Sequence, residues 1–329
     1  GVLNRVALAF SPDGRVLASG WVDGTVILYD RASGARLSTQ RAHAGASEAV
    51  GWLPDGSAYY SGGSDGSVFI WETQTHRLRR RLNGNPVRSL ALAGDGWQLL
   101  AGNADGTAML WDIRTGRSLL ALRRDPDEMP GPVLAVTLLK GGAEALSAGR
   151  DGQVIRWDTS RRRPLRRLDL YGPALAEAWY APDGGFVSAL DEANRVRTWD
   201  AMTGDMLSSE QFRGVLRYPQ TPVEAQFGGL TARVVDSGIV IFVPETSQTR
   251  LVLTGYQDAV LDVAFSPDGG RLAAACADGM VLVWPLDRPD DPLRLAGHTG
   301  PVRSLAWSPD SRALASAAND GTLILWPIP

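Results

Sequence analysis

An aromatic residue recurs about every 42 residues along this chain, each time six residues after an aspartate. The pairs are Asp23/Tyr29, Asp65/Trp71, Asp105/Trp111, Asp151/Trp157, Asp236/Phe242, Asp278/Trp284 and Asp320/Trp326. Trp199 keeps the same rhythm, although Ala193 stands where its aspartate would be. A fixed period of this length indicates one supersecondary unit that is used many times. Such an array presents, first of all, an extended surface.

The last unit shows most clearly what is repeated. Residues 301–307 and 312–317 are two apolar strand candidates, joined by a Ser-Pro-Asp-Ser turn in which proline presets φ. An Asn-Asp-Gly-Thr hairpin turn at 319–322 leads into a third strand at 323–326. A fourth, more polar strand lies between successive units, as at 76–82 and 117–122. Four antiparallel strands per period are typical of a propeller blade.

The motifs also resemble a known family. Gly297-His298, Asp320 and Trp326 in the last unit, with Trp-Asp at 111–112, 157–158 and 199–200, are similar to the WD-repeat β-propellers. The resemblance covers essentially the whole chain and implies an all-β, eight-bladed β-propeller of four-stranded antiparallel blades. It predicts a single domain over residues 1–329, with units ending near 30, 72, 112, 158, 200, 243, 285 and 327.

The blade count leaves one strand unaccounted for. Eight three-strand units can be found, but only seven fourth strands, because Pro327-Ile328-Pro329 alone follows Trp326. Similar propellers close by lending an N-terminal strand to the last blade. We therefore expect the last blade to lack its outer strand here, and a covalently linked upstream region of a larger protein to supply it.

Composition limits the compartment and the partners only loosely. Net charge is −3, too near neutral to indicate a partner class, and Cys276 as the single cysteine allows no internal disulfide. No apolar run approaches the length of a membrane span, and no signal peptide is visible. Lys140 is the only lysine among 33 basic residues, a bias associated with high-GC bacterial genomes. We expect a bacterial, cytoplasmic protein whose N-terminus is truncated.

Two sets of residues have the composition of a hydrolase triad. They are His43, Ser61 and Asp65 in the second unit, and His298, Ser316 and Asp320 in the last. A nucleophile needs exposure and an oxyanion hole, and neither is indicated. In similar proteins these positions, with Trp71 and Trp326, form structural hydrogen-bonded tetrads. We therefore predict no catalytic site and no cofactor site. We also predict no metal site, because the remaining histidine, His76, lies too far from the other two histidines to complete a metal centre.

Two surfaces are candidates for binding. Propellers of this family commonly bind partners where the strand ends before each aspartate meet, which here selects Trp21, Glu48, Ser64, Arg88, Asn103, Arg150, Leu261, Arg303 and Asn319. Trp21 and Trp97 break the aromatic pattern, and we expect both to be exposed. Either is an interface anchor or a cover for nearby apolar surface. The fourth strands carry a candidate basic flank, which includes Arg79, Arg81, Arg123, Arg124, Arg163 and Arg166.

The sequence thus favours a non-enzymatic protein-interaction or sensory scaffold with a protein or peptide partner across one face. An alternative is that the basic flank binds nucleic acid or an anionic surface, although arginines on edge strands also serve to prevent aggregation. A cofactor-dependent propeller enzyme is a third hypothesis. It would need convergent charged residues at the mouths of the first strands, where Glu48, Arg88 and Arg303 are a small set.

Overall fold

The structure is a computed structural model. It describes residues 7–123, 131–161, 163–169, 175–180, 185–191, 195–200, 202–211, 224–227, 230–235, 238–243 and 248–329. These residues form antiparallel sheets throughout, together with one 3-10 turn, η1 (Lys140–Gly142). Within the described residues the all-β prediction, with four-stranded antiparallel sheets as the repeated unit, is confirmed.

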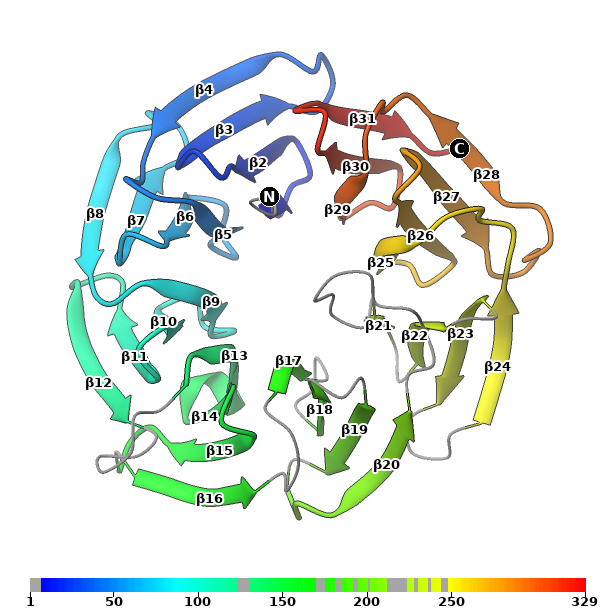
Figure 1. The fold of residues 1–329 in the computed structure, drawn as a ribbon. Coiled ribbons are helices and arrows are strands. Elements are labelled where there is room, and N and C mark those ends of the chain that lie inside the picture. Colours follow the sequence, from blue (N-terminus) through cyan, green and yellow to red (C-terminus); the bar gives the residue numbers. More distant parts are fainter. Residues whose placement is uncertain are drawn as a thin grey trace. The chain divides into compact units, whose positions relative to one another are not determined.

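One compact unit comprises residues 22–26 and 40–211 and contains four sheets (Figure 1). Their strands, in sheet order, are β5 (Ser47–Trp52), β6 (Ala58–Gly63), β7 (Ser67–Glu72) and β8 (Leu78–Asn83); β9 (Val87–Leu92), β10 (Gln98–Asn103), β11 (Thr107–Asp112) and β12 (Arg117–Arg123); β13 (Val133–Leu139), β14 (Glu144–Gly149), β15 (Gln153–Asp158) and β16 (Arg163–Asp169); and β17 (Leu175–Tyr180), β18 (Phe186–Asp191), β19 (Arg195–Asp200) and β20 (Met206–Gln211).

The other unit comprises residues 1–21, 27–39 and 212–329. It contains most of the first sheet, and three further sheets. Their strands are β1 (Ala7–Phe10), β2 (Val16–Gly20), β3 (Thr25–Asp30) and β4 (Arg36–Arg41); β21 (Glu224–Phe227), β22 (Leu230–Val235), β23 (Gly238–Val243) and β24 (Gln248–Leu253); β25 (Val260–Phe265), β26 (Arg271–Cys276), β27 (Met280–Pro285) and β28 (Leu293–Ala296); and β29 (Val302–Trp307), β30 (Ala313–Ala318) and β31 (Leu323–Pro327).

The Asp-Gly turns explain why the second and third strands of a sheet form a hairpin. Gly24, for example, has φ +83°, a conformation that glycine adopts without steric cost. The aspartate before it accepts a hydrogen bond from the backbone N–H of Thr25 at 2.9 Å. The same positive φ recurs at Gly66, Gly106, Gly152, Gly279 and Gly321. The third strands accordingly end at Asp30, Glu72, Asp112, Asp158, Asp200, Val243, Pro285 and Pro327.

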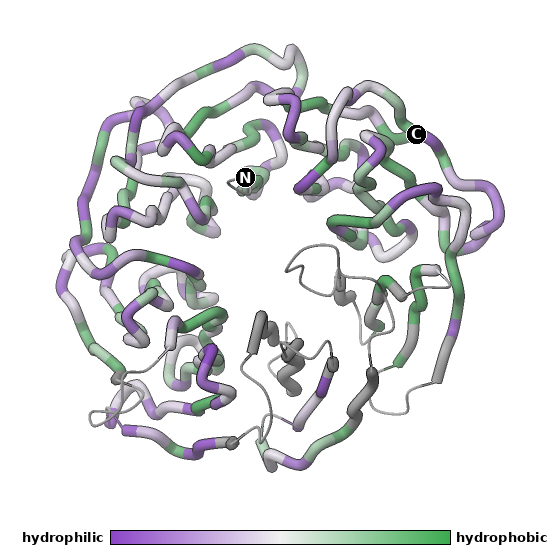
Figure 2. Tube along the Cα trace, in the orientation of Figure 1, coloured by the Kyte–Doolittle hydropathy of each residue, from purple (hydrophilic) through white to green (hydrophobic). Residues whose placement is uncertain are grey.

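The hydrophobic core lies between neighbouring sheets. In the unit of residues 40–211, Val68 and Leu82 of one sheet share a cluster with Val87, Leu99 and Trp111 of the next. In the other unit, residues of β27 pack with residues of β29 and β30 in the same way. The fourth strand β8 is largely hydrophilic (Figure 2), and its Leu82 is the residue that joins the first of these clusters. In this sheet the strands β6 and β7 are therefore buried, whereas β8 is mostly exposed.

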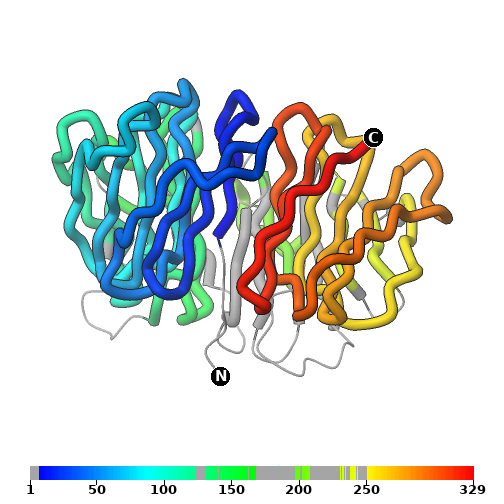
Figure 3. Tube along the Cα trace, turned by 90° about the horizontal axis from the view of Figure 1, so that it is seen from above, coloured from blue at the N-terminus to red at the C-terminus, as the bar shows by residue number. Residues whose placement is uncertain are grey.

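The sheet of β29–β31 packs beside the first sheet of the chain. Strand β1 contacts β29, and Figure 3 shows the blue and red segments side by side. The Arg31 guanidinium donates to the Asp310 carboxylate at 2.9 Å and to the carbonyl of Gly14 at 3.4 Å. Segments almost three hundred residues apart in sequence thus meet within one compact unit.

Candidate interaction face

A buried hydrogen-bonded site lies at the β6–β7 hairpin. His43 follows β4 and reaches Ser61 on β6, where Nε2 lies 2.9 Å from Oγ. Its Nδ1 lies 3.1 Å from Oδ1 of Asp65. The Trp71 indole N–H donates to the same serine at 3.3 Å. All four groups are satisfied when Nδ1–H donates to the carboxylate and the Ser61 hydroxyl donates to Nε2.

A missing side chain makes room for this histidine. A Cβ on Gly63 would lie 2.3 Å from Nδ1 of His43 and 2.8 Å from Oδ1 of Asp65. Real Cβ contacts are not that short, so the site requires glycine here. The sequence therefore encodes the tetrad partly through a residue that takes no part in its hydrogen bonds.

The last sheet contains a variant of the same site. His298 Nε2 lies 2.7 Å from Ser316 Oγ, which also accepts from the Trp326 indole at 2.7 Å. Nδ1 lies 2.8 Å from the hydroxyl of Thr322, and 3.5 Å from the Asp320 carboxylate. Thr322 in turn donates to Asp320 at 2.6 Å. The threonine hydroxyl therefore relays the contact that Asp65 makes directly in the second sheet.

The geometry of both sites is that of a structural network. Ser61 and Ser316 are completely buried, so a substrate has no approach to either hydroxyl, whereas a nucleophile must be reached. Each hydroxyl is also occupied by an indole donor and an imidazole. The arrangement fixes the register of the hairpin by satisfying buried polar atoms.

The two histidines should make stability depend on pH. Burial lowers the pKa of His43 and of His298 below the ordinary value, against the opposing effect of the nearby aspartates. An unfolded histidine binds a proton near pH 6.5, so the unfolded chain binds more protons than the folded chain below about that pH. Stability is therefore fully present above pH 6.5 and declines on acidification.

We expect the melting temperature to fall between pH 7.5 and pH 5.5, and this slope to flatten in the double variant His43→Gln, His298→Gln. Thermal melts at both pH values measure it. At still lower pH the aspartates contribute in the same direction. Burial alone would raise the pKa of Asp65, but hydrogen bonds from Ala44, Ser67 and His43 outweigh it and lower this pKa. An unchanged slope in the double variant would contradict the assignment.

Trp21 fills the equivalent site in the first sheet. The sequence predicts it to be exposed, but the side chain is half-buried and its indole N–H donates to Ser19 Oγ at 2.8 Å. Ser19 and Trp21 precede Asp23 by four and two residues, as Ser61 and Gly63 precede Asp65. The indole thus stands where the histidine stands above Gly63. The expectation of exposure fails because Trp21 supplies the donor that this serine needs.

Asn103 is likewise turned inward. The sequence places Asn103 on the candidate face, yet it is completely buried and its amide donates to Thr107 Oγ1 at 2.9 Å. Asn85 donates to Asp105 at 2.6 Å beside it. The expectation that Asn103 lies at the surface is wrong, because its amide belongs to a buried polar cluster. The third sheet has Ala101 where the second and last sheets have the tetrad serine.

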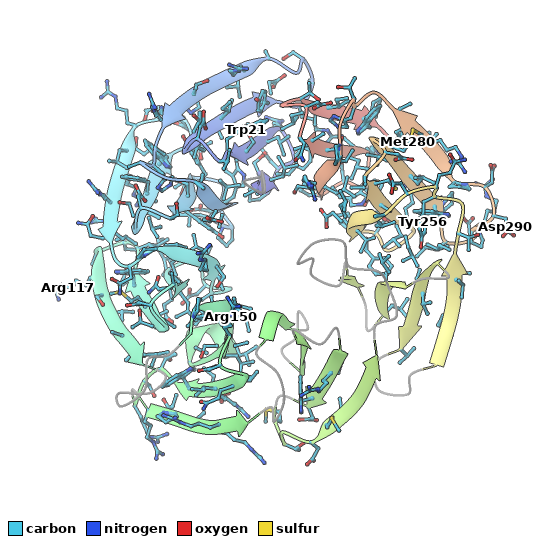
Figure 4. All side chains as sticks on the ribbon, in the orientation of Figure 1. Trp21, Arg117, Arg150, Tyr256, Met280 and Asp290 are labelled. Carbon is cyan, nitrogen blue, oxygen red and sulfur yellow. The ribbon has the colours of Figure 1, made fainter. Side chains whose placement is uncertain are left out.

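The remaining face residues divide between the two units. In one, Arg88 is 51% exposed and lies 4.0 Å from the Glu48 carboxylate, Ser64 is half-buried, and Arg150 is exposed. In the other, the Arg303 Nε donates to Asn319 Oδ1 at 3.3 Å, and Leu261 is half-buried. Trp21 directly follows β2 and Arg150 directly follows β14, and Figure 4 labels both residues. The structure therefore brings together Arg88 with Glu48 and Arg303 with Asn319.

Two arginines of the candidate basic flank make contacts within the chain. Arg81 donates to Ser67 Oγ at 3.0 Å and lies over the Phe69 ring at 5.5 Å. Arg166 donates to the carbonyl of Met202 at 3.4 Å. Arg79 and Arg163 are exposed. The Arg123 side chain and all of Arg124 lie outside the described residues.

Sequence reasoning predicted the exposure of Trp97 but missed two contacts in this region. Arg80 donates to the carbonyls of Arg114 and Thr115 in the next sheet at 2.7 and 3.0 Å, which fastens neighbouring sheets together. Trp97 is 36% exposed, and the Arg114 guanidinium lies over its ring at 4.9 Å. The periodic spacing could locate the Arg114 turn, but the stacking depends on two turns that only the folded sheet brings together.

The repeat motifs match a family model. The model described as WD domain, G-beta repeat, matches residues 3–30, 34–72, 247–285 and 292–327. Together these four segments make up less than half of the chain, and each is similar to a WD repeat. The matched segments include both sets of tetrad residues, His43 with Trp71 and His298 with Trp326. Two of the four matched segments thus hold a complete set of histidine, serine, aspartate and tryptophan, and the other two contain no histidine.

Two comparisons with known proteins agree with this assignment. The WD repeat-containing protein SL1-17 of Schistosoma mansoni is 27% identical over 146 residues, which cover 44% of this chain. The match covers 47% of that protein, so the chain aligns with about half of its length. The crystal structure of the computationally designed Ika8 protein is 26% identical, with a TM-score of 0.79, over 100% of this chain and 98% of the other.

The described residues contain no helix with the length and apolar character needed to cross a membrane. In the same residues, no three side chains among histidine, cysteine, aspartate and glutamate are grouped so that they could hold a metal ion.

Proposed function

We propose that this chain is a non-enzymatic protein-interaction scaffold whose partner contacts the sheet ends carrying Arg88 and Arg150 in one unit and Arg303 and Asn319 in the other. WD repeats generally mediate protein–protein interactions. The observation that carries the proposal is that some polar groups are buried in structural networks and others are accessible at the surface. The histidines and serines that could do chemistry are buried in structural networks, whereas long polar side chains remain accessible beside them.

These accessible side chains suit a protein partner. Arginine is enriched at interfaces and at their energetic centres, and Arg88 and Arg150 are both exposed. The opposed charge of Glu48 holds Arg88 loosely, at 4.0 Å, so that a carboxylate of a partner can compete for it. The basic flank has less support, since Arg81 and Arg166 make internal hydrogen bonds.

We further propose that the sheets are the eight blades of one propeller in a larger, cytoplasmic polypeptide, and that an upstream segment completes the last blade. The regular spacing of the eight third strands supports the blade count. The likeness to the designed protein over the whole chain supports a common fold.

Charge reversal tests the proposed face. We expect Arg88→Glu and Arg303→Glu each to reduce capture of a protein partner by about tenfold or more, the effect of losing roughly 1.4 kcal/mol at an interface. The measurement is affinity capture from a cell lysate followed by titration of the captured partner. Arg117→Glu is the matched control, because Arg117 is an exposed arginine on the fourth strand β12 (Figure 4).

The control separates the hypotheses. Loss of capture with Arg117→Glu, and not with the face variants, would place the contact on the strand edges instead. If neither reversal changed capture while both variants melted like the parent chain, the proposed face would be wrong.

A further inference from the structure

Exposed apolar side chains gather on two neighbouring fourth strands. Among the described residues, nine large hydrophobic side chains are exposed, and four of them lie on β16, on β20 and in the turn before β20. Single exposed hydrophobic residues are ordinary, whereas a group of them is typical of an interaction site. We call these four, which are 42–59% exposed, the methionine patch: Leu165, Met202, Met206 and Leu207.

One register position in the fourth strands explains where the patch lies. In the four sheets of residues 40–211, the fourth strand has a β-bulge beside the periodic tryptophan of the third strand, and the bulge leaves one extra residue unpaired. Within these four sheets, only the fourth and fifth sheets of the chain have two apolar residues at the bulge. The residue pairs, in chain order, are Leu78-Arg79, Ser118-Leu119, Pro164-Leu165 and Met206-Leu207.

A hydrogen bond between the two sheets brings their apolar residues together. The Arg166 guanidinium of β16 donates to the carbonyl of Met202, in the turn before β20, at 3.4 Å. Arg80 has the same register position on β8 and donates to the carbonyl of Arg114, which stands in its turn where Met202 stands. The contact therefore occurs between two pairs of sheets. In one it lies beside the charged residues Arg79 and Arg114, and in the other it lies within the methionine patch.

Arginines border the patch and determine the charge of its partner. Arg163, Arg166 and Arg167 are exposed on the same strand as Leu165. Within residues 163–167 and 202–207, which the structure describes, Asp205 is the single acidic residue. Complementary charge steers partners and suppresses wrong ones, so an apolar surface with a positive border favours an apolar partner with a negative border. Methionine side chains also adapt to apolar partners of different shapes.

The backbone of these strands favours a helix over a further strand. Pro164 has no N–H to donate, and the bulges at Leu165 and Leu207 interrupt the ladder that an added strand would extend. An amphipathic helix does not need that ladder, because its backbone is hydrogen-bonded internally and its apolar side chains meet the surface. We propose that the methionine patch binds an acidic amphipathic helix of a partner protein. This contact is additional to the proposed face with Arg88 and Arg303.

Methyl NMR tests the proposal, because Met202 and Met206 carry reporter groups within the patch. The chain is labelled with methionine that contains a ¹³C methyl group and is titrated with two synthetic amphipathic helices. Both have the same stripe of leucines, and the polar face carries glutamates in one and lysines in the other. We expect the glutamate helix to shift both signals, with half-saturation at about a tenth of the concentration that the lysine helix needs. Met280 of β27 is the reference and should not shift.

Met206→Asp and Leu78→Asp are a matched pair of variants. Both residues face the periodic tryptophan of their sheets, and both are exposed, Met206 at 59% and Leu78 at 47%. We expect Met206→Asp to weaken binding of the glutamate helix by about tenfold or more, read from the Met202 signal, because a buried apolar contact is replaced by a repelling charge. Leu78→Asp should leave the affinity unchanged. Arg163→Glu should also weaken binding, since it reverses the charge of the border.

Four other results would overturn the proposal. Equal affinity for the two helices, or unchanged affinity in Met206→Asp, would show that the patch does not select an acidic amphipathic helix. Shifts with anionic lipid vesicles and with neither helix would show a membrane-binding surface instead. Signals of Met202 and Met206 that broaden with protein concentration alone, with a dimer in light scattering, would show that a second copy covers the patch. No shift with any addition would show that the patch is not a docking site.

Discussion

Replacing Glu144 by alanine is expected to destabilise the chain by about 3–5 kcal/mol, the usual cost of stranding one member of a buried ion pair. The Arg156 Nε donates to Glu144 Oε2 at 2.6 Å, and the two side chains are only 11% and 13% exposed. Without the carboxylate, a buried guanidinium loses its opposite charge. Urea denaturation, read from the midpoint at constant slope, measures the loss.

The chain itself provides the control. In the second sheet the equivalent positions are Ala58 and Ile70, both at most 1% exposed. The double variant Glu144→Ala, Arg156→Ile reproduces that apolar pair, and replacing a buried ion pair by packed apolar residues is often neutral or stabilising. We expect it to recover most of the lost stability. A double variant as unstable as Glu144→Ala alone would show that the ion pair is not the cause.

Gly24→Ala is expected to cost about 3 kcal/mol or more, from two sources. An alanine at φ +83° pays roughly 1 kcal/mol for the left-handed conformation. Its Cβ would also lie 2.1 Å from the carbonyl oxygen of His43 and 2.6 Å from that of Gly45. Because both contacts are with backbone, relief requires the chain to shift, which typically adds 1–3 kcal/mol.

Gly34→Ala is the matched control for this effect. Gly34 has a similar φ of +68°, but a Cβ there would meet nothing within 4 Å. The substitution Gly34→Ala should lower the free energy of unfolding by only about 1 kcal/mol, the cost of the left-handed conformation. The difference in unfolding free energy between the two variants, measured in urea, then gives the cost of the contact with the His43 segment. Equal losses would mean that the close approach is not structurally required.

Much of the fold could be predicted from the sequence. The aspartate-to-aromatic spacing predicts units of antiparallel strands, and the described residues form antiparallel sheets of three or four strands. This works because the Asp-Gly turn is a local device, with a carboxylate that accepts from a backbone N–H two residues away. The eight-blade count and the missing strand remain proposals, because the number of blades is a property of how sheets assemble.

The candidate site was harder to predict from the sequence than the fold. Arg88, Arg150 and Asn319 are at the surface as expected, but Trp21 and Asn103 are turned into their sheets. Both stand two residues before the turn aspartate, where Gly63 leaves a space. Whether that space holds a histidine, an indole or an amide depends on which serine or threonine nearby needs a partner.

By itself, the sequence determined the repeated unit and its turns, since these depend on interactions between residues close together in one hairpin. The tetrad residues were predicted from the resemblance, because the histidine comes from outside the hairpin that it contacts. Only the tertiary structure decided which polar side chains are available. Arg81 is held against Phe69, Arg80 fastens the next sheet, and Arg156 is paired with Glu144. Each of these outcomes depends on strands or sheets that fold side by side, because a side chain's exposure is set by what packs over it and not by its own residue type.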